Sequence, residues 1–385
     1  MTDSGRQPSP AYVRYSPKLE RPGAHEEETI QKIIEILHRN NEWTFKKFKH
    51  GMRDAHAKSH AVLEGELVVE PGLPAHLRQG LFATPATYPV IARISSTQPT
   101  LHSDQIRGVR AIAIKVLGVP GPRAQDDGFT TQDFVMVDSP EFPFANARDY
   151  LWVGMPIAYV LTRMPDWALK LLTEALATLV GVTEAVSPVP SRLVPIPYFG
   201  KAVKLVKLFT TPNYHVLGLT FNTASALRYG TYVAKISVRP LSESVTRLQG
   251  KRIPPGSGDD AHRILIADFF RSHDAEYEVC AQLCTDADAI EDATREWSTS
   301  PPPQRVAKLI FRRQNSDCYC RRVYADDLLS FNSWRTLEAH RPLGSINRLK
   351  AKVYPASSGF RHDKNNAPQI EPSNISELPS CSSCR

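Results

Sequence analysis

The chain has 385 residues, of which 42% are hydrophobic and 23% are charged, so it can bury a large core and lacks the composition of a disordered protein. Its 47 basic and 40 acidic residues leave a net charge of only +7 with no long basic stripe, which argues against nucleic-acid binding. The N-terminus has no apolar signal core, and no apolar run reaches the roughly 18 residues of a membrane span, so neither is expected.

The first predicted element is a helix that begins at Glu26. Residues 1–25 are polar and proline-rich, and they predict a flexible N-terminal arm. From Glu26 onward acidic residues come early and basic residues late, as the helix dipole favours. Apolar residues recur there at helical spacing: Ile30, Ile33, Ile34 and Leu37.

Short β-like runs replace this pattern after residue 60. Four of them, separated by Gly, Pro and Asp clusters, cover residues 61–70, 88–96, 109–119 and 131–138. Three further runs cover residues 227–240, 275–286 and 304–313. Regularly spaced short strands with turn signals predict an antiparallel sheet or barrel, and with the helices an α+β fold.

A mostly helical insertion is expected at about 145–210. It contains WALKLLTEALATLVGV at 167–182, whose apolar spacing fits an amphipathic helix. We expect this helix to pack against the main body of the protein. The alternative is a position at a membrane surface or a contact with an apolar or lipid substrate.

The C-terminal part predicts one more helix, which begins near Ser345 and is stopped or kinked at Pro355. Residues 26–361 are therefore expected to form a single domain, and residues 362–385 a disordered tail. The six cysteines, at positions 280, 284, 318, 320, 381 and 384, lack the paired spacing of a zinc finger. Reduced thiols and a cytoplasmic location are expected.

Positively charged side chains interrupt the apolar strands. Arg93 and Arg110 alternate with apolar neighbours, and Arg53 stands three residues before His56 in the stretch RDAHAKSHAVLEG. Each alone is compatible with an outward-facing side chain, but together they indicate a shared anion within the fold, because buried charges are costly unless paired. The nitrogen-rich stretch leaves four alternatives: a zinc site, a nucleic-acid patch, a solvated turn or one wall of a cofactor pocket.

Four segments, in this order, resemble the heme catalase superfamily and in particular its small catalase-like members, the catalase-related peroxidases. They are the segment 53–96 from RDAHAK to ARISS, then RAIAIKVLGVPG, TTQDFVMVDSPEF and SFNSWRTLEAHRPLGSINRLKAKVYPASSGFR. The resemblance extends from about residue 50 to residue 361. It implies a catalase-like antiparallel β-barrel core with flanking and C-terminal helices, and heme b as the cofactor.

The resemblance also implies which residues hold the heme. Tyr354 takes the position of the tyrosine that ligates the iron as a phenolate. The family has an arginine four residues earlier, where this chain has Lys350, which keeps the charge but loses the forked hydrogen bonding of a guanidinium. The remaining expected cofactor-binding residues are Arg53, Arg93 and Arg361 at the propionates, Arg110 among the strand arginines, and Tyr150 against the porphyrin face.

On the opposite face of the heme the resemblance implies His56 as the acid–base group. A neutral imidazole can take a proton from one peroxide oxygen and deliver it to the other. His60 is interpreted as structural. Asp138 is expected at the catalytic site, where the small catalase-like proteins usually have asparagine, which can donate a hydrogen bond that an ionised carboxylate cannot. Three alternatives stay open: Asp138 is protonated, it points elsewhere, or the chain is a poor catalase.

The expected function is that of a heme-dependent oxidoreductase that consumes hydrogen peroxide or an organic hydroperoxide. Two alternatives are a heme-binding protein with weak or no turnover and a fatty-acid hydroperoxide-converting enzyme of the allene oxide synthase type. An apolar or lipid substrate and a homo-oligomeric state are compatible with either.

Overall fold

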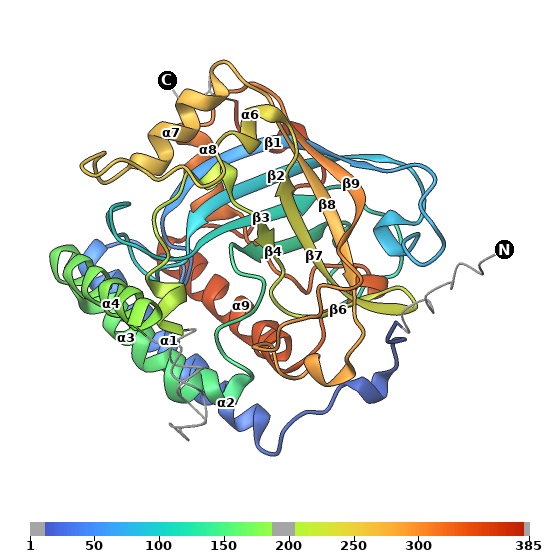
Figure 1. The fold of residues 1–385 in the computed structure, drawn as a ribbon, viewed down its shortest axis with the longest axis horizontal. Helices are drawn as coiled ribbons and strands as arrows, with labels where there is room; N and C mark the ends of the chain where they lie inside the picture. The colour runs from blue at the N-terminus through green and yellow to red at the C-terminus, as the bar shows by residue number, and fades with distance from the viewer. Residues whose placement is uncertain (1–11, 187–204, 381–385) are drawn as a thin grey trace.

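Eight strands close into an antiparallel β-barrel within residues 12–186 and 205–380, which the computed structural model describes (Figure 1). The ring runs in the order β5-β4-β3-β2-β1-β9-β8-β7, and β7 pairs back with β5 to close it, while β6 pairs with β7. The strand bounds are β1 Ser59–Val69, β2 Thr87–Ser96, β3 Arg110–Val116, β4 Gln132–Val137, β5 Phe221–Asn222, β6 Leu227–Tyr229, β7 Tyr232–Pro240, β8 Ala275–Leu283 and β9 Gln304–Phe311. The predicted α+β class with an antiparallel barrel is confirmed.

Each predicted β-like run corresponds to strand in the structure. The run at 227–240 is divided at Gly230, whose φ of 59° suits a tight turn, into β6 and β7. The sequence pattern missed β5, because two residues are too few to show alternation. Side chains of one face fill the barrel with a closed apolar core that includes Leu63, Ile94, Ile114, Met136, Ile236, Val279 and Leu309.

The helices lie outside the barrel. Their bounds are α1 Glu26–Phe48, α2 Ala147–Asp149, α3 Met155–Arg163, α4 Asp166–Val186, α6 Glu243–Thr246, α7 Ala261–Phe270, α8 Tyr319–Val323 and α9 Ser345–Asn365, with π-helical turns at Tyr150–Gly154 and Tyr324–Leu328. The helix predicted from Glu26 is confirmed. Part of the insertion expected at 145–210 forms α2, α3 and α4, and its residues 187–204 lie outside the described residues. Among the described residues, no helix is long and apolar enough to cross a membrane.

Helix α9 begins at Ser345, as predicted, but it continues for ten residues beyond Pro355. Of the two predicted alternatives, a helix that stops at Pro355 is therefore wrong, and a kink there stays a prediction. Buried Val353 and Phe360, on either side of the proline, anchor both halves of the helix. A second apolar cluster joins α9 to α1 through Ile30, Ile33, Leu37, Ile346, Leu349 and Val353.

Both chain ends contact the barrel where the structure describes them. In the expected N-terminal arm, Val13 donates its backbone N–H to Cys284 and Glu20 pairs with Arg348. In the expected C-terminal tail, Leu378 is buried and Glu371 pairs with buried Lys115. A buried ammonium group is costly without a carboxylate beside it, so the pair of Lys115 and Glu371 holds the tail against the protein. The described part of the tail, through residue 380, is therefore packed. Residues 1–11 and 381–385, with the CxxC, lie outside the described residues.

Candidate cofactor cavity

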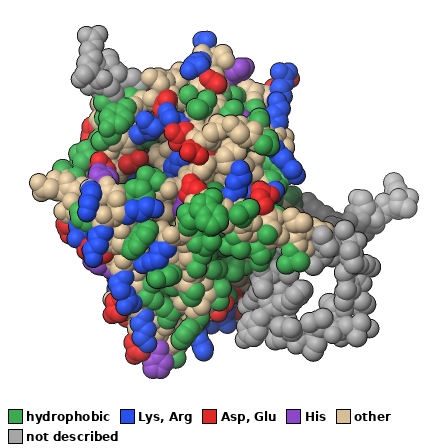
Figure 2. All heavy atoms as spheres, turned by 90° about the vertical axis from the view of Figure 1, so that its left-hand side faces the viewer, with side chains coloured by type: hydrophobic (Ala, Val, Ile, Leu, Met, Phe, Trp, Pro, Cys, Tyr) green, Lys and Arg blue, Asp and Glu red, His purple; other side chains and the backbone are tan. Residues whose placement is uncertain are grey.

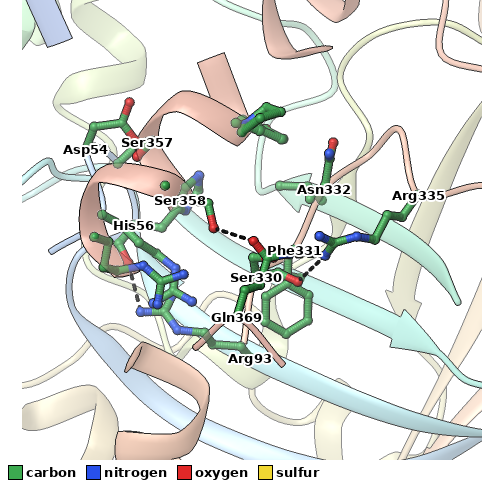
Figure 3. Close-up of a pocket in the computed structure, with 18 of the residues that line it drawn as sticks. Asp54, His56, Arg93, Ser330, Phe331, Asn332, Arg335, Ser357, Ser358 and Gln369 are labelled. Carbon is green, nitrogen blue, oxygen red and sulfur yellow. Dashed lines mark hydrogen bonds between the residues drawn. The ribbon is translucent and has the colours of Figure 1, made fainter. Parts of the chain in front are cut away.

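A cavity of about 350 Å³ lies between the outer face of the barrel and helix α9. Figure 3 shows that its labelled residues come from the turn before β1, from β2, from the loop around residue 330, from α9 and, at Gln369, from the segment after α9. Five of the residues predicted from the sequence line it: Arg53, His56, Arg93, Tyr354 and Arg361. Residues that are distant along the chain thus meet at a single concave site.

The barrel wall of this cavity is built by residues that share one face of three neighbouring strands. Arg93 on β2 lies beside Ala113 on β3, which lies beside Val135 on β4, and Ser95 pairs with Ala111. The intervening residues of these strands point into the apolar core instead. Because two alanines occupy the wall on β3, a flat ligand has room to approach the strand closely.

Tyr354 reaches the cavity from α9, one residue before Pro355. Burial, and then the negative charges of Asp54 and Tyr150, raise the pKa of the Tyr354 phenol above its ordinary value. Asp54 also lines the cavity, and its carboxylate accepts a hydrogen bond of 2.7 Å from Ser357 Oγ. The phenol is therefore neutral in this environment, and only a cation at its oxygen would convert it to a phenolate.

His56 faces the cavity from the turn that precedes β1. Its φ of 59° lies in the left-handed region, which is uncommon for a residue with a side chain and marks a constrained position. Its Nδ1 lies 3.3 Å from Ser95 Oγ. Burial, and then the charges of Arg93, Arg53 and Lys350, lower the pKa of His56 to about 3. The ring is therefore neutral near pH 7 and has one nitrogen able to accept a proton.

Three arginines lie together at one end of the cavity, and two of them, Arg53 and Arg93, contact the same carboxylate. Arg93 Nε donates to Asp326 Oδ1 at 2.8 Å, and Arg53 Nη1 lies 3.4 Å from the same oxygen. The guanidinium groups of Arg53 and Arg361 also donate to backbone carbonyls of the turn at Tyr324–Leu328 and of Leu329. Burial, and then neighbouring arginines, lower the pKa of Arg53 well below its ordinary value and that of Arg361 to about 10.

This arginine cluster carries more positive than negative charge. In addition, the buried Nε of Arg361 has no hydrogen-bond partner among the described residues. An anionic ligand would relieve both the like-charge repulsion and the unmet hydrogen-bonding capacity. The cluster therefore has the properties of an anion-binding site.

Asp138 and Arg110, also predicted at the site, do not line the cavity. Asp138 stands just beyond the end of β4, and its Oδ1 accepts a hydrogen bond from the backbone N–H of Arg110. Burial raises the pKa of Asp138 to about 6. The Arg110 guanidinium points to the other side of the strand, where it donates to His262 Nε2 at 2.8 Å and to Asn213 Oδ1. Of the three alternatives for Asp138, the structure matches the one in which it points elsewhere.

Tyr150 and Lys350 lie behind the cavity wall and not on it. Tyr150 belongs to the apolar cluster between α1 and α9, and its ring packs against Phe142 and Phe144. Lys350 Nζ lies 5.4 Å from the centre of the Phe142 ring, and burial lowers the pKa of this lysine to about 8. Its charge acts on His56 through space.

Several lining residues were not found from the sequence. Arg335 donates to Ser330 (Figure 3). It also pairs with Glu371 at 2.7 Å, and its guanidinium lies 5.1 Å from the Phe129 ring centre. Asn332, Ser95 and Asp54 also contribute polar atoms. Ser95 could have been identified, because it stands two residues after Arg93 and therefore on the same strand face. The loop residues have no periodic pattern to reveal their direction.

A second cavity, of about 620 Å³, is lined by Arg53, which also lines the first cavity, and by Asp326 of the arginine cluster. Its other charged residues include Lys58, Asp166, Asp259, Asp260, Arg263, Arg322 and Asp327. No group of three or more His, Cys, Asp or Glu side chains suited to a metal ion occurs in residues 12–186 or 205–380.

Comparison with solved structures identifies the fold. No family model and no curated protein matches the sequence. A fungal catalase superposes with a TM-score of 0.56 at 16% identity over 88% of this chain and 67% of its own. Catalase A from Saccharomyces cerevisiae superposes with a TM-score of 0.55 at 14% identity, over 87% of this chain and 69% of its own. A bacterial catalase superposes with a TM-score of 0.53 at 15% identity, over 97% of this chain and 72% of its own. The chain therefore has a catalase-like fold.

Proposed function

We propose that this chain is a heme-dependent oxidoreductase, related to the small catalase-like proteins, that consumes hydrogen peroxide or an organic hydroperoxide. The observation that carries the proposal is that Tyr354 and His56, from opposite ends of the domain, line one cavity together with Arg53, Arg93 and Arg361. The catalase-like fold supports the same conclusion at the level of architecture.

The residues of the cavity fit heme b. Tyr354 offers an oxygen ligand for ferric iron, and the arginine cluster offers positive charge and an unpartnered Nε for two propionates. The alanine wall on β3 suits a planar group. When bound, the heme iron would supply the redox chemistry for cleaving a peroxide bond.

His56 would move the proton in that reaction. Its neutral ring, oriented by Ser95 Oγ, would accept the proton from one peroxide oxygen and return it to the other. Arg93 donates to the backbone carbonyl of His56 at 2.9 Å and would hold the constrained turn in place. Asp138 would have no direct part, because its carboxylate lies outside the cavity.

One set of contacts favours a second candidate, a heme-binding protein with weak or no turnover. Asp54 stands beside Tyr354 and raises the pKa of its phenol. Lys350 replaces the arginine that the family places nearby, and it points toward the Phe142 ring. Asp54 opposes formation of the phenolate, and Lys350 would support the phenolate less well than a forked guanidinium, so Tyr354 would be a weaker iron ligand.

Reconstitution with hemin separates these functions. The wild type should bind heme and show a tyrosinate-ligated ferric absorption spectrum, which the Tyr354→Phe variant should lose. Tyr324→Phe is the control, because that buried hydroxyl has no hydrogen-bond partner among the described residues. His56→Ala should keep heme but lower kcat/KM for peroxide by about 10²–10⁴-fold.

Heme uptake without peroxide turnover in the wild type would select the second candidate. Absence of heme uptake by the wild type, or an unchanged spectrum in Tyr354→Phe, would reject both. Testing hydrogen peroxide beside a fatty-acid hydroperoxide identifies the substrate class, and conversion of the latter to an epoxide would indicate allene oxide synthase chemistry.

A further inference from the structure

Helix α4 presents apolar side chains to solvent in a regular row. Trp167, Leu171, Ala175 and Leu179 follow one another at intervals of four residues, and all four are exposed. The exposed fractions of the three large side chains are 69%, 65% and 59%. The side that faces the protein carries Leu169 and Thr173, which are buried. A surface helix normally turns its polar side chains to solvent and its apolar ones to the protein. This exposed row, here called the outer stripe, therefore suggests that another molecule binds over it.

Neighbouring elements extend the apolar surface. The π-helical turn before α3 exposes Trp152 by 71% and Val153 by 44%, and α3 exposes Tyr159 and Val160. Figure 2 looks onto the side of the molecule that carries α1, α3 and α4, where hydrophobic side chains gather. Soluble proteins seldom expose so many large apolar side chains together unless they bind something there.

The charges around the outer stripe are unevenly distributed. The two acidic residues of α4 whose side chains the structure describes are engaged with the protein body: Asp166 binds His102 at 2.7 Å, and Glu174 forms a double hydrogen bond with Arg107. Lys170, between Trp167 and Leu171, is exposed. Among the described side chains, the solvent side of the helix therefore carries a cation beside the apolar row.

Helix α1 adds further positive charge beside this surface. Lys47 Nζ lies 5.2 Å from the centre of the Trp43 ring. The Arg163 guanidinium on α3 lies 5.3 Å from the same ring centre. Arg163 also lies 3.6 Å from the Tyr159 ring centre. The exposed lysines at the end of α1 and the exposed aromatic of α3 are therefore parts of one surface, on which cations and aromatic rings alternate.

We infer that the outer stripe and the adjoining residues of α3 form a docking surface for an anionic phospholipid bilayer. Tryptophan, leucine and lysine together are the residues of helices that lie in a membrane interface, since the rings and apolar side chains enter the acyl boundary while the ammonium groups bind lipid phosphates. A second copy of the chain fits less well, because a two-fold interface would bring Lys170 of each copy toward the other. This docking does not depend on the bound cofactor.

Vesicle binding by the full-length protein tests the inference. The wild type should co-sediment with phosphatidylcholine vesicles that contain phosphatidylserine, and its tryptophan emission should shift to shorter wavelength. Leu171→Ser and Trp167→Ser should each lower the partition coefficient by about tenfold or more, because each removes a large inserted side chain. Lys170→Glu should lower it at least about fivefold on anionic vesicles and should have little effect on pure phosphatidylcholine.

Tyr319→Ser is the matched control, since Tyr319 on α8 is 66% exposed but lies on another element. It should bind vesicles as the wild type does. Trp152→Ser repeats the test outside α4 if a stripe variant fails to fold. Vesicle binding that survives all three apolar substitutions, or no binding by the wild type at low salt, overturns the inference. Concentration-dependent dimerisation that is lost in Leu171→Ser, without vesicle binding, would assign the surface to a second copy instead.

Discussion

Helices α9 and α4 both contain 21 residues, but the more polar helix is the one that buries its polar side chains, and the more apolar helix exposes apolar ones. Helix α9 is rich in charged and polar residues, yet Asn347, Arg361 and His362 are buried in it. Helix α4 is predominantly apolar, yet Trp167 and Leu171 are more than half exposed. The position of a helix in this protein is therefore not set by its average hydropathy.

The difference lies in the partners that surround each helix. Arg348 of α9 is enclosed by three carboxylates, from Glu20, Glu26 and Glu291, which come from the N-terminal segment, α1 and a loop. Although burial disfavours its charge, the hydrogen bonds that this guanidinium donates to Glu26 and Glu291 raise its pKa. A polar helix can be enclosed when each charge is matched, whereas the apolar outer face of α4 has no protein surface against it in the described residues.

Removing the matched charge of α9 should have a large effect on stability. Arg348→Met leaves three partly buried carboxylates without a cation, and we expect the free energy of unfolding to fall by about 3 kcal/mol. Lys352→Met is the control on the same helix, because Lys352 is 55% exposed and 3.8 Å from Glu27. It should cost less than about 0.5 kcal/mol. Urea unfolding measures both, and equal losses would contradict the matched-charge explanation.

Two leucines on α4 should separate the buried side of that helix from the exposed side. Leu169 is fully buried, so Leu169→Ala should lower the free energy of unfolding by about 2–4 kcal/mol through lost burial and a residual cavity. Leu171→Ala, two residues later and 65% exposed, should change it by less than about 0.5 kcal/mol. The same urea titration measures both variants. Similar costs would mean that α4 is covered on both sides in solution.

Asp138, unlike Arg348, is a partly buried group with no ion pair among the described residues, and its carboxylate accepts a hydrogen bond from the backbone N–H of Arg110. The folded protein retains its proton up to about pH 6, whereas an unfolded chain releases it near pH 4, about 3.9 for a free aspartate. The native state binds more protons in this window, so stability is lost as the pH rises from about 4 to 6.

Asp138→Asn should remove the loss of stability between about pH 4 and pH 6, because an amide does not titrate. The free energy of unfolding at pH 7 should therefore rise by about 1–2 kcal/mol. Thermal unfolding between pH 4 and pH 7 should therefore give a flatter profile for the variant than for the wild type, with the two meeting at low pH. A variant that is less stable at pH 7 would show that the carboxylate has a stabilising partner. Peroxide turnover should change little, because Asp138 lies outside the cavity.

Most of the barrel could be predicted because apolar residues of the core alternate along its strands with residues of the outer face. In β2, for example, Arg93 stands between Ala92 and Ile94, although all three are buried. The long helices could be predicted from their apolar spacing. The packing of the tail could not, since Glu371 enters the protein through its pairing with Lys115 and Arg335, which no local pattern records.

The candidate site was predictable only where a resemblance supplied the residues. His56, Arg93 and Tyr354 line the cavity as expected, but Asp138 and Arg110 do not. Arg110 is the first residue of β3, at an even position with Ile112 and Ile114, so its side chain belongs to the opposite face from Ala111 and Ala113. Asp54 and Asn332 reach the cavity from irregular segments, whose direction depends on contacts made after folding.

The amino-acid sequence by itself determined the strands, the two long terminal helices and the set of positive charges that the fold must accommodate, because hydrophobic periodicity and charge are local properties of the chain. Only the tertiary structure decided that Arg53 and Arg93 share the Asp326 carboxylate while Arg361 donates to the backbone carbonyl of the same residue. It also decided that Tyr354 and His56 face one cavity, and that an apolar row of α4 points outward. These features depend on contacts between segments hundreds of residues apart, and the free energy of such contacts is set by geometry that no local pattern contains.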